Sequence, residues 1–349
     1  VSELTLQEKI RRLTSEYGVS GDEHRVAEIA RELMEPYCDR VEVDAFGNVL
    51  GWRDCGIPGA KTVLLDAHID QIGFTVTEVT EEGFLRFTTE GGVDQRMLLG
   101  SELTVLTRDR GPILGIVAAM PPHLQKAGDQ KKSVPIPEMV VDIGMTGPQA
   151  RETVHVGDFM AFANDMMELK NDSICGKAFD DRACLVCLLH TMELLQDKKL
   201  PVNVVLSAST KEETGFDGGL INAYKVHPDY AIAVDVTHAR TGDAPQVCAR
   251  LGDGAILSIG SNSLPRLAQK AMEVARAKEI PHLAECCPSR SGTHAWPMQT
   301  QREGCQTLVI SLPLKYMHSP VELVRMEDVK SVGRLTAEFI LSLEGGRAE

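Results

Sequence analysis

Apolar residues recur at helical spacing in two segments near the start of the chain. Residues 4–17 and 23–37 each carry apolar positions three and four residues apart, which predicts two helices. Residues 18–21 separate them, and Ser20 is available there to cap the second helix. Residues 41–52 place short β-branched stretches on either side of Gly47-Asn48, a pattern typical of a hairpin.

Continuous apolar runs alternating with helical patterns predict the main fold. Residues 62–66 form a short apolar run, as expected of a strand buried on both faces of a mostly parallel sheet. Further strands are expected at residues 202–207, 230–234 and 308–311, and helices at 181–195, 218–224, 265–278 and 324–343. This alternation favours an α/β class: a mostly parallel mixed sheet with helices on both faces.

The pattern changes between about residues 72 and 164. Short alternating segments, such as residues 74–78, 103–106 and 113–117, are closely punctuated by Gly and Pro. This is typical of a small all-β barrel, with residues 121–137 as a long polar loop inside it. We therefore expect one domain made of residues 1–71 and 165–349, interrupted by an inserted β-barrel domain of residues 72–164.

Composition and charge exclude two classes of partner. The 349 residues include 50 acidic and 36 basic side chains, a formal net charge of -14, and no basic stripe, which argues against nucleic acid. The longest apolar run, residues 183–189, is much shorter than the roughly 20 residues of a membrane-spanning helix. The start, Val1-Ser2-Glu3, does not resemble an export signal, so we expect a cytoplasmic protein.

The nine cysteines have no spacing typical of a disulfide framework, which favours buried, reduced thiols. Cys184 and Cys187 form a C-x-x-C, but they lie within an apolar run that is predicted to be helical. Core packing is therefore favoured over a redox or zinc site. Cys286 and Cys287 are likewise expected to pack.

Acids and histidines follow the predicted buried strands, where open α/β sheets place their functional sites. The residues concerned are His68, Asp70, Glu212, Glu213, Asp235 and His318, together with Asp180 and Asp181 directly before a predicted helix. Each has a structural alternative when taken alone: a satisfied histidine, a helix N-cap at Asp180 or Asp181, or a solvated loop at Glu212-Glu213. Together they indicate more, because several carboxylates cannot share one edge without a compensating positive charge.

A pair of divalent metal ions would supply that charge. Histidine and carboxylate ligands without thiolates suit zinc, cobalt or manganese in a catalytic site. Two such ions can polarise a scissile carbonyl, activate a bridging water and hold a free α-amine. The residue types therefore favour hydrolysis, and exopeptidase over endopeptidase action.

Five short motifs resemble those of the tetrahedral (TET) aminopeptidases, peptidase family M42, which includes glutamyl, deblocking and FrvX-like aminopeptidases among the co-catalytic zinc exopeptidases. They are His68-Ile-Asp70, Ala178-Phe-Asp-Asp-Arg182, Glu212-Glu213-Thr-Gly215, Asp235-Val-Thr237 and Tyr316-Met-His-Ser-Pro320. The resemblance spans nearly the whole chain. It implies a zinc-exopeptidase-like metallopeptidase domain, residues 1–71 and 165–349, and an insertion that serves assembly into a homododecamer.

The resemblance also implies a role for each residue. Asp180 would bridge the two metals, with His68 and Asp235 completing one site. Glu213 and His318 would complete the other. Glu212 would be the general base, and Asp70 would orient the His68 ring. A cis peptide bond between Asp180 and Asp181 is implied as well.

The function predicted from the sequence is that of a hydrolase, a dinuclear aminopeptidase that acts on short peptides with a free N-terminus and uses zinc or cobalt. The alternatives are a deacylase of small N-acyl compounds, an endoglucanase, or an inactive oligomeric scaffold. With 5% aromatic residues and two tryptophans, the chain offers few platforms for cellulose. All inferred ligands and the base are present, which argues against an inactive scaffold.

One segment departs from the family pattern. Members commonly have Gly-Thr-Asp where this chain has Gly292-Thr293-His294, followed by Trp296. If this loop borders the substrate pocket, the preference for acidic residues shown by glutamyl members would change. The alternative is that His294 and Trp296 only pack.

Overall fold

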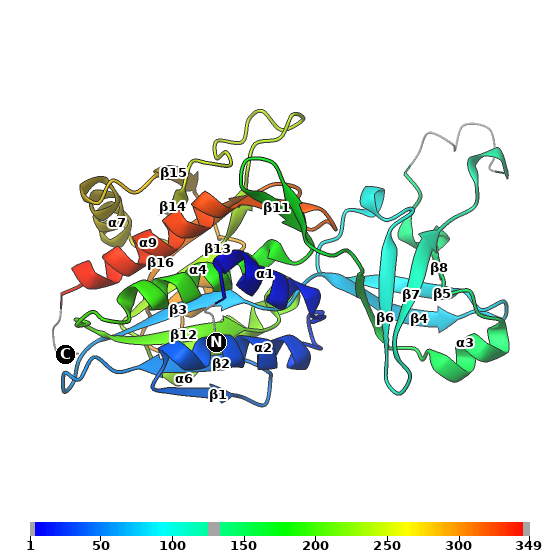
Figure 1. Ribbon diagram of the computed structural model, residues 1–349, viewed down its shortest axis with the longest axis horizontal. Coiled ribbons are helices and arrows are strands. Elements are labelled where there is room, and N and C mark those ends of the chain that lie inside the picture. The colour runs from blue at the N-terminus through cyan, green and yellow to red at the C-terminus, as the bar shows by residue number, and fades with distance from the viewer. Residues whose placement is uncertain (1–3, 125–132, 345–349) are drawn as a thin grey trace.

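The computed structural model describes residues 4–124 and 133–344. Figure 1 shows two lobes, an α/β lobe on the left and a smaller β lobe on the right. Residues 1–3, and the part of the expected 121–137 loop from 125 to 132, lie outside the described residues. Within the described residues, no helix is long and apolar enough to cross a membrane.

The α/β lobe is built on an eight-stranded sheet in the order β1-β2-β12-β3-β13-β16-β14-β15. Its strands are β1 (Arg40–Val43), β2 (Val49–Arg53), β3 (Thr62–His68), β12 (Asn203–Ser209), β13 (Tyr230–His238), β14 (Ala255–Gly260), β15 (His282–Cys287) and β16 (Gln306–Leu314). The four central strands β12, β3, β13 and β16 are parallel, while β2 and β14 join them antiparallel. The mostly parallel mixed sheet is confirmed, and β14 and β15 are additions that the sequence pattern did not predict.

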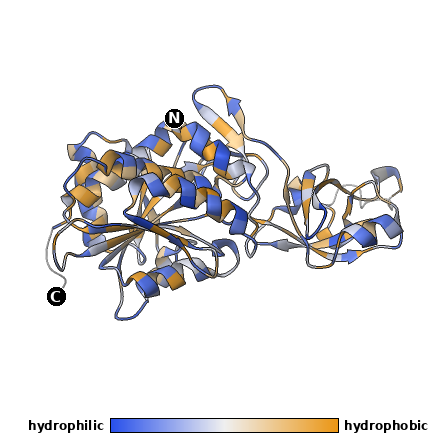
Figure 2. Ribbon diagram, turned by 60° about the horizontal axis from the view of Figure 1, so that its bottom comes forward, coloured by the Kyte–Doolittle hydropathy of each residue, from blue (hydrophilic) through white to orange (hydrophobic). Residues whose placement is uncertain are grey.

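Helices cover both faces of this sheet, as Figure 2 shows edge-on. Side chains alternate along β3, so that Val63 and Leu65 enter one apolar core while Leu64 enters the other. The first core is formed with α1 (Leu6–Ser15), α2 (His24–Met34), α4 (Phe179–Leu195), α7 (Pro265–Ala277) and α9 (Met326–Ser342). The second is formed with α6 (Asp217–Val226) and α8 (Ala295–Gln299). The short helices α5 (Glu212–Gly215) and η1 (Glu35–Tyr37) complete the lobe.

Two expectations about helix ends are wrong. Ser20 does not cap α2, because its hydroxyl contacts Thr214 at 2.8 Å, and α2 begins after Glu23 without a side-chain cap. The closing helix begins at Met326 rather than residue 324, because the preceding residues pair in a separate three-stranded sheet. This sheet contains β10 (Met167–Leu169), β11 (Ser173–Gly176) and β17 (Glu322–Arg325).

The smaller lobe is a closed barrel with strand order β4-β5-β8-β7-β6-β9, in which every pairing is antiparallel. Its strands are β4 (Gly73–Val79), β5 (Leu85–Glu90), β6 (Glu102–Thr107), β7 (Gly111–Ala118), β8 (Val140–Asp142) and β9 (Phe159–Phe162). It also carries α3 (Gly147–Thr153), η2 (Gln95–Met97), η3 (Pro122–Leu124) and η5 (Ile136–Glu138). Phe74 fills the barrel edge-on to Phe87 and Phe162, with 5.4 Å between ring centroids in each pair. These strands lie inside the predicted insertion, whose boundaries at 72 and 164 stay a prediction.

The nine cysteines are all free, but they are not all buried. Cys184 and Cys187 lie fully buried on α4, which confirms core packing. The expectation of buried thiols is wrong for Cys248 and Cys286, which are exposed. Cys286 lies on the edge strand β15, where alternate side chains face away from the protein.

Candidate metal centre

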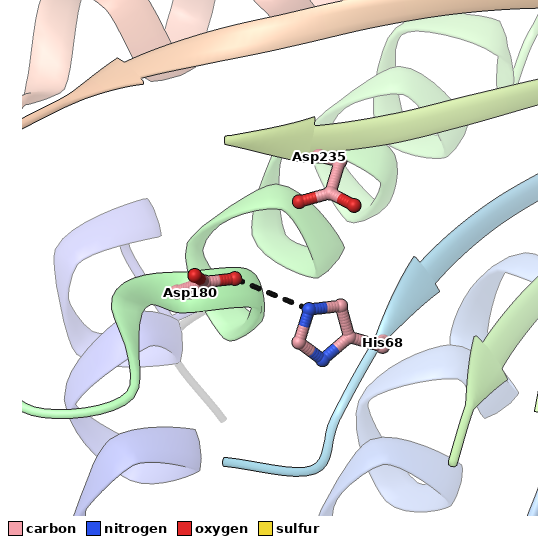
Figure 3. Close-up of side chains that lie close together, drawn as sticks. All are labelled: His68, Asp180 and Asp235. Atoms are coloured by element: carbon pink, nitrogen blue, oxygen red, sulfur yellow. Dashed lines mark hydrogen bonds and ion pairs between the residues drawn. The ribbon is translucent and has the colours of Figure 1, made fainter. Parts of the chain in front are cut away.

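Three of the predicted ligands meet near the carboxyl end of β3 (Figure 3). His68 is the last residue of β3, Asp235 lies in β13, and Asp180 precedes the regular part of α4. The His68 Nε2 atom is 3.1 Å from Asp180 Oδ1. One ligand atom from each of the three residues lies within 4.8 Å of the other two.

A second group shares Asp180 with the first. His318 Nε2 is 3.2 Å from Asp180 Oδ2 and 3.3 Å from Glu213 Oε2. Ligand atoms of these three residues also lie within 4.8 Å of one another. Because Oδ1 of Asp180 faces His68 and Oδ2 faces His318, this carboxylate stands between the two groups.

Glu322 holds the backbone that presents Asp180 and His318. One of its carboxylate oxygens accepts the N–H groups of Phe179 at 2.8 Å and Asp180 at 3.1 Å. The other accepts the N–H of His318 at 2.9 Å. The peptide bond from Asp180 to Asp181 is cis, as the resemblance implies. Glu322 was not among the residues that the sequence singled out, and its only signal was an acid two residues after the motif that ends at Pro320.

Asp70 holds the other side of the site. Its two carboxylate oxygens accept the N–H groups of Glu212 at 3.0 Å and Glu213 at 3.2 Å. Its Oδ1 atom is also 3.3 Å from Nδ1 of His68, the ring nitrogen that faces away from Asp180. The same Nδ1 atom is 3.1 Å from the backbone oxygen of Asp70. Asp70 therefore contacts three of the predicted functional residues, and its role in orienting the His68 ring stays a prediction.

Arg182, part of the quoted motif, has a structural task that the sequence did not reveal. It is fully buried and donates to the backbone carbonyls of Ile69, Leu13, Glu16 and Gly18. These bonds fasten the end of α1 and the loop after β3 to α4. Burial lowers the pKa of Arg182 to about 10, so it stays a cation at neutral pH.

Several buried acids lie close together in the site, and their protonation shows whether metal ions would fit there. Burial raises the pKa of Glu212 and Glu213 well above the usual range, and burial with the nearby Asp180 raises that of Asp235 to about 7. Burial opposes ionisation of Asp180 too, but hydrogen bonds from His318 and His68 lower its pKa.

Two of these acids also have unused oxygens. The Oε1 atoms of Glu212 and Glu213 are buried without a hydrogen-bond partner in the described structure. Divalent cations would balance the excess of negative charge and bind the unpaired buried oxygens, and they accept nitrogen and oxygen ligands of this kind. The residues therefore fit the metals that the sequence predicted.

A pocket of about 400 Å³ opens onto both groups, with Asp180, Glu212, Glu213, Asp235 and His318 in its wall. The barrel lobe takes part as well. Gly92, which lies just after β5 in the chain, lines the same pocket, and a Cβ atom added to it would lie 3.0 Å from Nδ1 of His318. The site is therefore closed on one side by the inserted lobe.

His294 packs beneath the site and does not line the pocket. Its side chain is buried, with Nδ1 at 2.7 Å from Asp66 Oδ2 and 3.0 Å from Ser209 Oγ. Its Nε2 atom accepts the N–H of Gly219 at 3.3 Å. The packing alternative therefore holds for His294 itself, although its loop borders the pocket through Gly292. Trp296 does not line the pocket either. Its ring packs edge-on against the ring of Phe216, which does line the pocket, with 6.4 Å between the ring centroids.

Comparisons with known proteins identify the family of this chain. A family model described as M42 glutamyl aminopeptidase matches residues 47–335. Lysyl aminopeptidase of Pyrococcus furiosus is 32% identical over 97% of this chain and 97% of its own length. Among solved structures, a TET aminopeptidase from a marine sediment Thaumarchaeota archaeon is 32% identical, with a TM-score of 0.91 over 97% of this chain and 96% of its own. The TET1 peptidase of Pyrococcus horikoshii, described as assembling into a tetrahedron or a large octahedral shell, is 29% identical, with a TM-score of 0.84 over 97% of this chain and 100% of its own.

Replacing His294 with Ala is expected to destabilise the fold by about 2–4 kcal/mol, because it opens a cavity and removes a hydrogen-bond partner of the buried Asp66. Urea unfolding measures the change. The control is His227→Ala, which removes a histidine from an exposed pair with Glu303 and should leave the midpoint nearly unchanged. Equal midpoints for the two variants would show that the His294 contacts do not stabilise the fold.

Proposed function

The chain belongs to the M42 glutamyl aminopeptidase family and is an aminopeptidase, and we propose that it removes N-terminal residues from short peptides with two divalent metal ions. The observation that carries this proposal is the position of Asp180. Its two oxygens face two different groups of ligands, each complete with a histidine and a further carboxylate. A carboxylate in that position suits a bridge between two cations.

One ion would be held by His68, Asp235 and Asp180, and the other by Glu213, His318 and Asp180. These nitrogen and oxygen donors suit zinc or cobalt. When bound, such a pair supplies Lewis acidity to the scissile carbonyl and to the attacking water. His68 is kept in place for this task by Asp70, and His318 by Glu322 through its backbone N–H.

Glu212 is proposed as the general base. Its carboxylate lies in the pocket wall beside both ligand groups, with Oε2 at 3.8 Å from His68 Nε2. Its Oε1 atom has no hydrogen-bond partner in the described structure, so that atom is available to take a proton from the attacking water. The same carboxylic acid then donates the proton to the leaving amine. Asp70 fixes the position of Glu212 through its backbone N–H.

The pocket gives little support to a glucanase. Among the described residues that line it, Phe216 is the one aromatic residue. Trp52 lies elsewhere, with the Arg40 guanidinium 3.9 Å from its ring centroid. The deacylase alternative uses the same metals, and N-acetylated substrates separate it from an aminopeptidase.

We further propose that the inserted lobe, residues 72–164, holds the subunits together in a homododecamer. Two adjacent outward positions of β7, Leu114 and Ile116, are 57% and 51% exposed. Apolar positions of this kind favour contact with another protein surface. The described assemblies of the P. horikoshii relative support a second copy of this chain as the partner. An enclosed assembly would admit peptides and exclude folded proteins. A cytoplasmic location stays a prediction from the sequence.

Hydrolysis of a panel of free-amine peptides and of their N-acetylated counterparts tests the reaction. We expect the metal-replete enzyme to release N-terminal residues from the free-amine peptides only. The chelated enzyme should be inactive until zinc or cobalt is added back. Cleavage of the acetylated peptides alone would replace the aminopeptidase with a deacylase, and full activity in chelator would remove the metal ions from the proposal.

Replacing Glu212 with Gln should keep both metal ions and lower turnover by about 10²- to 10⁴-fold, because the carboxylate that moves the proton is lost. Asp180→Ala is the matched variant, expected to lose metal as well as turnover because it belongs to both ligand groups. Elemental analysis and kcat measure the two effects separately. Unchanged turnover in Glu212→Gln would exclude it as the base, and a full metal complement in Asp180→Ala would exclude the bridge.

Replacing Leu114 with Arg should reduce a large assembly to smaller species, since it places a charge on the exposed face of β7. Light scattering measures the mass. Leu220→Arg is the control, because Leu220 is also exposed, at 43%, but lies on α6 in the α/β lobe. An unaltered mass for Leu114→Arg would show that this face is not the contact.

A further inference from the structure

The part of the pocket wall that is not assigned to metal binding or proton transfer is uncharged. Among the described residues, three apolar side chains contribute to it, those of Phe216, Val236 and Met317. Thr214 adds a hydroxyl group, but this group is already bonded to Ser20 at 2.8 Å. No Lys or Arg belongs to the described lining, and its acids are the four already given a role in metal binding or proton transfer.

The pocket has no unpaired charge that could bind a charged side chain of the substrate. If the two ions are divalent, their four positive charges balance the four carboxylates of the wall, Asp180, Glu212, Glu213 and Asp235. An acidic or basic side chain inside the pocket would then be buried without a partner, which is unfavourable. Arg290 does not change this balance, because its guanidinium stacks on the Trp296 ring, 4.1 Å from the centroid, and neither residue lines the pocket.

The pocket, of about 400 Å³, leaves room for a side chain of moderate or large size, and one of its three glycines has open space beside it. Gly92, Gly215 and Gly292 all line it. A Cβ atom added at Gly292 would meet no atom within 4 Å, so the space beside this residue is open. Phe216 stands between this pocket and the rings of His294 and Trp296, with centroid distances of 6.1 and 6.4 Å, and is braced by both.

We propose that this pocket selects an uncharged apolar N-terminal residue of the size of Leu, Met or Phe, over Glu and Lys. The inference rests on the proposed aminopeptidase function and adds its substrate class. It separates this chain from the relatives named for lysyl and glutamyl activity, since the described wall offers neither a spare carboxylate for lysine nor a cation for glutamate.

The test is kcat/KM of the metal-replete enzyme for dipeptides Xaa-Ala, with Xaa as Leu, Phe, Ala, Glu or Lys. Leu and Phe should exceed Glu and Lys by at least about tenfold, the discrimination that a few apolar contacts provide. A panel led by Glu or Lys would overturn this inference while leaving the aminopeptidase intact. Hydrolysis of none of the five would overturn the proposed function, and the inference with it.

Binding gives a readout that does not depend on turnover. Isothermal titration of the metal-replete enzyme with free leucine, glutamate and lysine, the products of the reaction, should rank leucine tightest. Glutamate or lysine binding as tightly as leucine would overturn the inference.

A substitution in the pocket wall tests where the side chain of the N-terminal substrate residue lies. Gly292→Val should lower the Leu-to-Ala ratio of kcat/KM by about tenfold, because the added side chain occupies open space at the pocket wall. Gly242→Val is the matched control, since a Cβ atom there also meets nothing within 4 Å but Gly242 does not line the pocket. The control should keep the ratio. The same ratio in both variants would show that the substrate side chain does not lie against Gly292.

Discussion

The structure depends on a concentration of buried carboxylates at one edge of a sheet. Asp180, Glu212, Glu213 and Asp235 share the wall of one pocket, and burial raises the pKa of three of them. Acids held this close and out of water repel one another unless a positive charge is supplied. The folded chain brings only two histidines into direct contact with them among the described residues, so divalent cations are the natural complement to the arrangement.

Such a site requires that the backbone around it be held firmly, and other buried polar groups do this. Asp70 and Glu322 act as acceptors for backbone N–H groups on opposite sides of the site. Arg182 binds four carbonyl groups that belong to segments preceding its own helix. These residues hold the proposed ligands without belonging to either candidate group, which is the usual task of hydrogen-bonding partners around a metal site.

The two lobes contribute different parts of the site. The sheet of the α/β lobe directs ligands from β3 and β13 to one edge, as parallel strands do when their carboxyl ends coincide. The barrel closes the pocket with Gly92 and carries exposed apolar residues on the outer face of β7. Outside the pocket wall, His294 links Asp66 on β3 with Ser209 on β12. The histidine that replaces the Asp of the family's Gly-Thr-Asp pattern is therefore a buried packing residue.

The sequence by itself determined the fold class, the inserted barrel and the set of residues at the strand ends. The apolar run that leads into His68 reveals both a buried strand and the polar residue at its end, because that information is local. The run before Asp235 reveals a buried strand too, but β13 continues past Asp235 to His238 because it pairs with β16 as far as Leu314. The interactions of Glu322 and Arg182 were not visible, since Glu322 binds Phe179 across 143 positions and Arg182 binds Leu13 across 169. The exposure of Cys286 and the start of α9 at Met326 were missed because they depend on which strand lies at an edge and which strand pairs with β11. Those facts depend on contacts between distant segments, which only the tertiary structure decides.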